Sequence, residues 1–195
     1  MEQVSHPLLP ELLTCLQSPK ATVRYGSSKT LIILSHQDPT LLYPHFQDFI
    51  ELLDSPHRIL TWNALTIIAN LTTIDTNHYF EHIFNHYYSF LKSGYLITAA
   101  TVIENSPTIA TNKPLLADTI ATRLLTIDTL HTSPHLTQEC KHILAQKTLT
   151  ALDQFYDLLT NHEPILKFAT KHTTSTRTTT KKTAQAFLNK HRGNP

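Results

Sequence analysis

A stretch of 23 residues recurs within this chain at a distance of 37 residues. Residues 12–34 read LLTCLQSPKATVRYGSSKTLIIL, and residues 49–71 read FIELLDSPHRILTWNALTIIANL. When the two are superimposed, a Ser-Pro pair falls on a Ser-Pro pair, and the apolar or small residues Leu13, Leu16, Val23, Ser27, Leu31 and Leu34 fall on Ile50, Leu53, Leu60, Ala64, Ile68 and Leu71. A repeat of this length indicates stacked structural units that bury their core between neighbours.

Each unit is expected to be a pair of helices. The apolar residues recur at helical spacing. Tight hairpin turns favour glycine, and the chain has only 3 glycines among 195 residues. We therefore predict an all-α, right-handed solenoid that forms a single domain over residues 1–195. Its four to five helix pairs are expected at about 5–37, 40–75, 78–112, 114–160 and 163–191.

The helix boundaries follow from recurring turns and from proline. A Ser-Pro or Ser-Gly turn is expected within the first four units, at residues 18–19, 55–56, 93–94 and 133–134, and the last of these is expected to start a long helix. Pro107 predicts a kink or break in the second helix of the third unit, because it lacks the N–H that an internal hydrogen bond requires. The last unit is expected to form helices at 164–172 and 176–190, joined by 173–175.

The first unit resembles the HEAT repeat, whose second helix carries a Val-Arg pair followed by small and apolar positions. Here these are Val23-Arg24, Ser27, Leu31 and Leu34. The resemblance extends over residues 6–190 but loosens after unit one, where Leu60-Thr61 replaces Val-Arg. It implies a curved array that binds proteins or other polymers along a concave face, and it implies that the arginine ties one repeat's loop to the next. Fold-level analogy alone does not establish a function.

The second helices of the first two units are predicted to carry a partner-binding ridge. If Val23, Ser27, Leu31 and Leu34 form the core stripe, positions near 25, 28, 29 and 32 face outward. Tyr25 and Trp62 then occupy equivalent positions in adjacent repeats, and aromatic residues beside basic ones are typical of binding hot spots. Packing of both rings between helices is the competing interpretation. The ridge comprises Arg24, Tyr25, Lys29, Trp62, Leu65 and Thr66.

Charge is distributed unevenly along the chain. Residues 1–163 hold 9 Lys and Arg against all 15 acidic residues, a net charge of 9 − 15 = −6, and the remaining residues hold 7 basic and no acidic residues, or +7. A solvated end unit, an acidic protein or second copy, and nucleic acid are three interpretations of this basic end. The candidate contacts are Lys167, Lys171, Arg177, Lys181, Lys182, Lys190 and Arg192.

No residue pattern predicts catalysis or a cofactor. His78, His82 and His86 follow one another at spacings of four, which makes them weak metal candidates without a fourth ligand. Among enzymes with HEAT-like folds, the deoxyhypusine hydroxylases hold iron through several His-Glu pairs, whereas this chain has only His162-Glu163. The DNA glycosylases use a basic groove, whereas this body is acidic. Bilin lyases remain an alternative without a specific signal.

The predicted function is therefore a non-catalytic scaffold for a protein partner, with nucleic-acid binding as the alternative. The sequence does not determine the oligomeric state. A cytoplasmic protein without membrane association is expected, because the amino terminus lacks a basic signal region and no apolar run approaches the length of a membrane span. The distant Cys15 and Cys140 are expected to be reduced.

Overall fold

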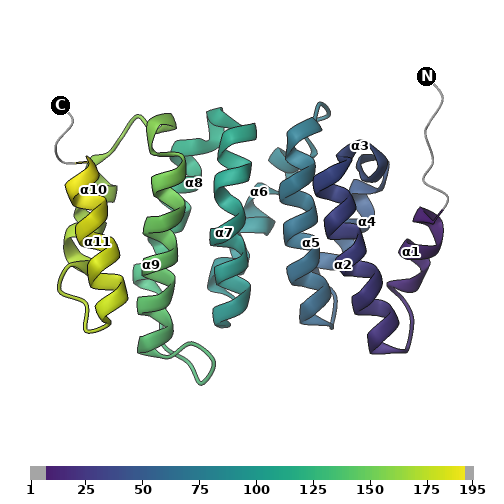
Figure 1. Cartoon of the computed structure of the whole chain (residues 1–195), viewed down its shortest axis with the longest axis horizontal. Helices are drawn as coiled ribbons and strands as arrows, with labels where there is room; N and C mark the ends of the chain where they lie inside the picture. The colour runs from purple at the N-terminus through teal and green to yellow at the C-terminus, as the bar shows by residue number, and fades with distance from the viewer. Residues whose placement is uncertain (1–7, 192–195) are drawn as a thin grey trace. The chain divides into compact units, whose positions relative to one another are not determined.

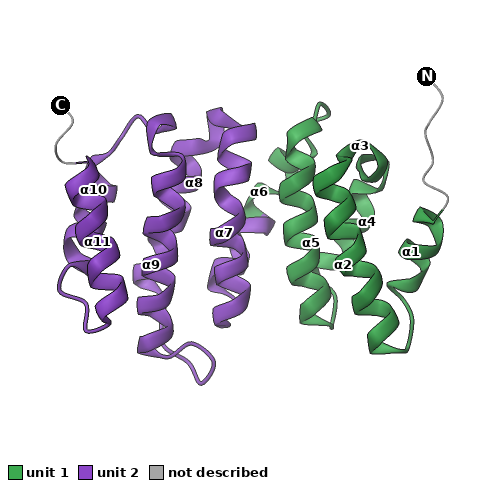
Figure 2. Cartoon of the chain, viewed as in Figure 1, with its two compact units in different colours: residues 1–85 green, residues 86–195 purple. Residues whose placement is uncertain are grey.

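The computed structural model describes residues 8–191, and this part of the chain is helical, with no β-strand. The all-α prediction is thus confirmed. The chain divides into two compact units, residues 1–85 and 86–195, and the boundary falls within the sequence of α6 (Tyr79–Ser89) (Figure 2). The single domain over residues 1–195 stays a prediction, and each compact unit is described by itself below.

Unit 1 contains the two copies of the repeat. Its longest helices, α2 and α5, are the second helices of the first two pairs, and α2 packs against α1 and α5 while α5 packs also against α4 (Figure 1). The sequence between α2 and α4 is divided by Pro44 into two short helical segments. The elements are α1 (Leu9–Cys15), α2 (Ala21–Gln37), α3 (Pro39–Leu42), η1 (Tyr43–His45), α4 (Phe46–Leu53), α5 (Arg58–Leu71) and η2 (Thr72–Ile74).

Unit 2 follows the same scheme, because its long helices α7, α9 and α11 pack successively against one another (Figure 1). The shorter α8 packs against α7, and α10 packs against α11. The helices predicted at 164–172 and 176–190 are present as α10 and α11. The elements are η3 (Phe90–Lys92), α7 (Leu96–Asn112), η4 (Pro114–Leu116), α8 (Ala117–Leu125), η5 (Thr126–Thr129), α9 (Gln138–Gln154), η6 (Tyr156–Leu158), α10 (Glu163–His172) and α11 (Thr178–His191).

A serine forms the same local hydrogen bond in five turns of the chain. In each turn its Oγ accepts the backbone N–H two residues later, at 3.2 Å for Lys20 and 3.1 Å for His57 in unit 1. Such a bond stabilises a turn without help from the rest of the fold. Four of these turns were predicted from Ser-Pro or Ser-Gly pairs, and the fifth lies in the predicted linker. The serines are Ser18, Ser55, Ser93, Ser133 and Ser175.

The predicted core stripe of α2 is correct only in part. Ser27 and Leu31 are buried, but Val23 is 37% exposed and Leu34 is half-buried. The buried face is rotated toward α5, so that Ser28 and Ser35 join it. Hydrogen bonds from α5 to these two serines, described below, explain the rotation.

In unit 2, the break considered at Pro107 does not occur, and one predicted helix start is wrong. The helix α7 continues through Pro107, so no break occurs there. The apolar side chains of Val102, Ile103 and Ile109 on either side of the proline are fully buried, and this packing offsets the missing hydrogen bond. The helix α9 begins at Gln138 rather than at the Ser133-Pro134 turn, because the Thr137 side chain caps it by accepting the backbone N–H of Cys140 at 3.3 Å.

Candidate functional site

Two interhelical hydrogen bonds fix the register of α2 and α5. The Asn63 side-chain amide donates to Ser28 Oγ at 2.7 Å, and the Asn70 amide donates to Ser35 Oγ at 2.9 Å. Each pair of partners is 35 residues apart, and the second bond lies seven residues beyond the first in both helices. The two helices therefore run parallel, and a slip along their axes would break both bonds.

The serines take part in a second bond each, so that each hydroxyl group both donates and accepts. Ser28 Oγ donates to the carbonyl of Tyr25 at 3.0 Å, and Ser35 Oγ donates to the carbonyl of Ile32 at 2.7 Å. Because the buried hydroxyl both donates and accepts, neither polar group is left unsatisfied in the interface. The sequence signal was present as serines and asparagines at a spacing of seven, but the 37-residue alignment does not pair them.

The outer side of the α2–α5 pair carries part of the predicted ridge. Tyr25, Trp62 and Thr66 are half-buried there, and Lys29 is exposed. Trp62 and Thr66 flank Asn63 on α5, next to the edge that contacts α2. We call these four residues the outer ridge.

Two predicted ridge residues belong to the interior instead. Leu65 is fully buried and Arg24 is 8% exposed, so their predicted outward orientation is wrong. The reason is the rotation of α2 and α5 that brings the Ser–Asn bonds together. On α5 this rotation leaves Leu65 on the side opposite Asn63.

Arg24 holds the turn of its own helix pair. Its Nη1 donates to the Ser18 carbonyl at 2.6 Å, and its Nη2 donates to the Tyr25 hydroxyl at 3.4 Å. The guanidinium carbon also lies 4.9 Å from the centre of the Tyr25 ring. These contacts lie within one helix pair, whereas the HEAT resemblance implied a tie between successive repeats. Within residues 8–191, the buried Nε of Arg24 has no hydrogen-bond partner.

The basic side chains near the end of the chain are largely neutralised within unit 2. Lys171 pairs with Asp128 at 2.8 Å, and Lys190 pairs with Asp153 at 2.9 Å. Two further pairs join Arg177 to Glu139 at 2.6 Å and Lys167 to Glu163 at 2.6 Å. Lys181 and Lys182 are exposed and have no ion pair with any described residue. Arg192 lies outside the described residues.

In two of these ion pairs, the aspartate also bonds a histidine. Asp128 also bonds His172 at 3.0 Å, and Asp153 also bonds His191 at 2.6 Å, so each aspartate meets a consecutive Lys-His pair. Burial by itself raises the pKa of Asp128 and Asp153, but the hydrogen bonds and charges of these partners outweigh burial and lower both pKa values below the ordinary range. We call the set Asp128, Lys171 and His172 and the set Asp153, Lys190 and His191 the two aspartate clamps.

Acid is expected to destabilise unit 2 through the aspartate clamps. Because the folded-state pKa of each aspartate lies below its unfolded value of about 3.9, ionised aspartate stabilises the folded state above that pH. This contribution is lost as the pH falls through the lowered pKa values. At pH 7 the double variant Asp128→Asn/Asp153→Asn is expected to have a lower melting temperature than the parent. Between about pH 5 and pH 2 its melting temperature is expected to fall less than that of the parent.

Circular dichroism melting curves across this pH range test the expectation. The matched control is Asp157→Asn, because Asp157 is exposed and has no ion pair within the described part of the chain. A double variant whose melting temperature fell with acid as steeply as that of the parent would show that the clamps do not control the acid response.

The histidines of residues 8–191 do not gather into a metal site. Within residues 8–191, no group of three or more His, Cys, Asp or Glu side chains is arranged to hold a metal ion. His78 instead bonds Glu81 at 2.9 Å, His82 is exposed, and the His86 ring lies 5.4 Å from that of Phe90. The His162 ring stacks on Tyr156 with centroids 4.1 Å apart.

Asp75 is an organising residue that the sequence analysis did not identify. It is 6% exposed and accepts the Tyr43 hydroxyl at 2.8 Å and the backbone N–H groups of Tyr79 and Phe80 at 2.9 and 3.0 Å. One carboxylate thus starts α6 and ties it to η1. A signal existed, because Asp38 lies 37 residues earlier and accepts the Thr40 N–H at the start of α3.

Comparison with models of known protein families, with curated proteins and with solved structures finds no match for this chain. Within the described residues, no helix has both the length and the apolar character needed to span a membrane.

Proposed function

We propose that this chain is a non-catalytic interaction scaffold built from HEAT-like helix pairs. The partner is a protein, and the contact surface is the outer ridge of Tyr25, Lys29, Trp62 and Thr66. The observation that supports this proposal is the pair of Ser–Asn bonds between α2 and α5. These bonds fix the two aromatic residues on one side of two parallel helices before any partner arrives, which reduces the entropy cost of binding.

The composition of the outer ridge also favours a protein partner. Tyrosine and tryptophan provide large contact areas with few rotatable bonds, and they are enriched among residues that dominate binding energy. Lys29 adds a charge at the edge of the aromatic pair, where it can pair with an acidic group. Ile33 on α2 is 55% exposed and adds apolar area to the outer ridge.

Nucleic-acid binding receives less support from the geometry. That alternative requires free cations for phosphate, whereas Lys171, Arg177 and Lys190 are paired with carboxylates of unit 2. Displacing these carboxylates would cost part of the energy that phosphate contacts supply. Lys181 and Lys182 are the remaining described candidates at this end of the chain.

The outer ridge is tested by capture of partners from the host lysate with nuclease present. The variants Tyr25→Ala/Trp62→Ala and Lys29→Glu are expected to lose proteins that the parent retains. Loss of a hot spot worth about 2 kcal/mol weakens binding roughly thirtyfold. Gln47→Ala on the exposed side of α4 serves as the control.

Circular dichroism must show that each variant keeps its helices. The Lys29→Glu variant is informative because its exposed side chain can change charge without disturbing the packing of Tyr25 and Trp62. Retention of every captured protein by both folded variants would overturn the outer ridge. Loss of all captured material after nuclease treatment of the parent would instead favour nucleic acid.

A further inference from the structure

The basic and acidic residues of unit 1 occupy different parts of the repeat. The second half of each copy, from the serine turn to the end of the following helix, covers residues 18–37 and 55–74. These two segments, which we call the basic layer, hold every Lys and Arg of residues 1–85 and none of the eight acidic residues. The basic layer thus carries +4, with histidine neutral, in a unit whose net charge is 4 − 8 = −4. Its cations are Lys20, Arg24, Lys29 and Arg58.

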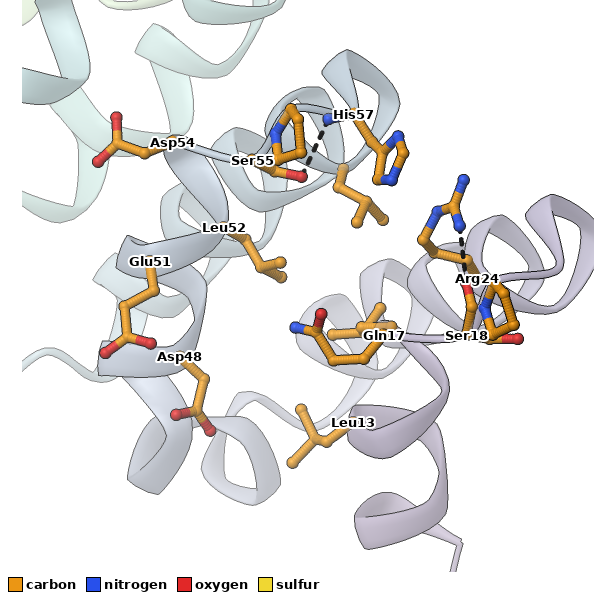
Figure 3. Close-up of a pocket in the computed structure, with 14 residues that line it drawn as sticks. Leu13, Gln17, Ser18, Arg24, Asp48, Glu51, Leu52, Asp54, Ser55 and His57 are labelled. Carbon is orange, nitrogen blue, oxygen red and sulfur yellow. Dashed lines mark hydrogen bonds between the residues drawn. The ribbon is translucent and has the colours of Figure 1, made fainter.

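The folded unit places the two kinds of charge on different helices. The helices α2 and α5 of the basic layer pack against each other, and Figure 1 draws them in front of α4, which carries Asp48 and Glu51. In Figure 3, Glu51 is directed away from Arg24, and the Arg24 Nη1 donates to the Ser18 carbonyl rather than to a carboxylate. The surface formed by α2 and α5 is therefore basic, whereas α4 behind it is acidic.

Two exposed lysines of the basic layer are available to a partner. Neither Lys20 nor Lys29 has an ion pair with any residue between 8 and 191. Nine residues separate them, which corresponds to about 13 Å along a helix. In unit 2, by contrast, Lys171 and Lys190 are paired with aspartates at 2.8 and 2.9 Å. An acidic group that approaches α2 therefore meets cations that the fold itself does not neutralise.

Apolar and aromatic side chains accompany Lys29 on the same surface. Tyr25 lies one turn before Lys29 on α2 and is half-buried, and Ile33 lies one turn after it and is 55% exposed. Trp62, also half-buried, provides a second aromatic ring on the neighbouring α5. A partner that covers this surface is expected to combine carboxylates with apolar side chains.

We propose that the outer ridge binds an acidic and apolar segment of a protein partner. The Asp or Glu side chains of this segment pair with Lys29 and Lys20, and its apolar side chains pack on Ile33 and Trp62. The inference rests on the proposed scaffold function and names the chemistry of the partner. A long polyanion such as nucleic acid suits the surface less well, because the net charge of −4 on unit 1 repels charge that extends beyond the basic layer.

Fluorescence anisotropy with synthetic peptides tests the acidic preference. The probe is a labelled, N-acetylated and C-amidated hexapeptide of alternating Glu and Leu, and the comparison peptide has Lys in place of Glu. The whole chain is expected to bind the acidic peptide at least tenfold more tightly than the basic one. Lys29→Glu is expected to weaken binding of the acidic peptide at least tenfold, because it replaces an attractive charge with a repulsive one.

The matched control is Lys92→Glu, which makes the same charge change at an exposed residue of η3, outside the basic layer. It is expected to change the affinity less than threefold. Circular dichroism checks that both variants keep their helices.

Trp62 provides a second readout, because it is the only tryptophan of the chain. Its emission reports on the outer ridge without a label and without a substitution. The unlabelled acidic peptide has no aromatic residue, so any change in emission during its titration comes from Trp62. We expect the emission to change with the same concentration dependence as the anisotropy.

Four results would overturn the acidic partner. These are equal weakening by Lys29→Glu and Lys92→Glu, equal or tighter binding of the basic peptide, binding that leaves the Trp62 emission unchanged, and absence of binding at millimolar acidic peptide. A labelled thymidine oligonucleotide is titrated in parallel. If it bound more tightly than the acidic peptide and lost affinity in Lys29→Glu, the outer ridge would be a nucleic-acid surface instead.

The peptide assay and the capture assay fail separately. If the ridge variants lose captured proteins while the acidic peptide does not bind, the scaffold proposal stands and the acidic chemistry of the partner falls. If the acidic peptide binds through Lys29 while the ridge variants lose no captured protein, the chemistry of the surface stands and the scaffold proposal falls.

Discussion

Replacing Leu65 with alanine is expected to destabilise unit 1 by about 2–5 kcal/mol, the range for a fully buried leucine. Leu65 is 0% exposed in the middle of α5. The variant removes buried methyl groups and leaves a cavity that the neighbouring helices cannot fully close. Urea unfolding followed by circular dichroism measures the loss.

Thr66→Ala is the control for Leu65, because Thr66 is the next residue on α5 and is half-buried on the outer ridge. We expect a change of less than about 1 kcal/mol there, since little apolar area is removed. A Leu65→Ala variant as stable as Thr66→Ala would contradict the interior position of Leu65 and return it to the partner-binding surface.

Asp75→Ala is expected to cost about 3 kcal/mol, because three donors lose one buried acceptor. The Tyr43 hydroxyl and the N–H groups of Tyr79 and Phe80 would remain buried or half-buried without their carboxylate. The start of α6 should fray first. Amide hydrogen exchange is therefore expected to increase most at residues 79 and 80, and urea unfolding measures the overall loss.

Asp38→Ala provides the matched comparison for Asp75, since Asp38 lies at the equivalent place one repeat earlier. Its side chain accepts the backbone N–H of Thr40 and, within residues 8–191, bonds no residue of another helix pair. Loss of such a cap typically costs about 1 kcal/mol. Equal losses for Asp38→Ala and Asp75→Ala would refute the organising role of Asp75.

Local features of the chain were predictable from its sequence. The serine turns depend on a bond between a residue and the N–H two positions later, so they follow from short sequence patterns. The all-α class and the last helix pair follow from the spacing of apolar residues and from the scarcity of glycine. These predictions required no knowledge of which helices meet.

Features that depend on contacts between helices were not predictable. Periodicity placed Leu65 on the outside because a helical wheel fixes relative directions and not the direction of the core. The core direction was set by the Asn63 and Asn70 bonds, which join residues 35 positions apart.

The aspartate clamps have a consequence for the order in which unit 2 becomes stable during synthesis. Asp128, Glu139 and Asp153 leave the ribosome before the bases that neutralise them, which lie in and just before α10 and α11. A nascent chain that has reached only α9 therefore carries these carboxylates without their counter-ions. Their charge-pair stabilisation arrives only when the following helix pair has been made, so translation itself delays the final consolidation of this unit.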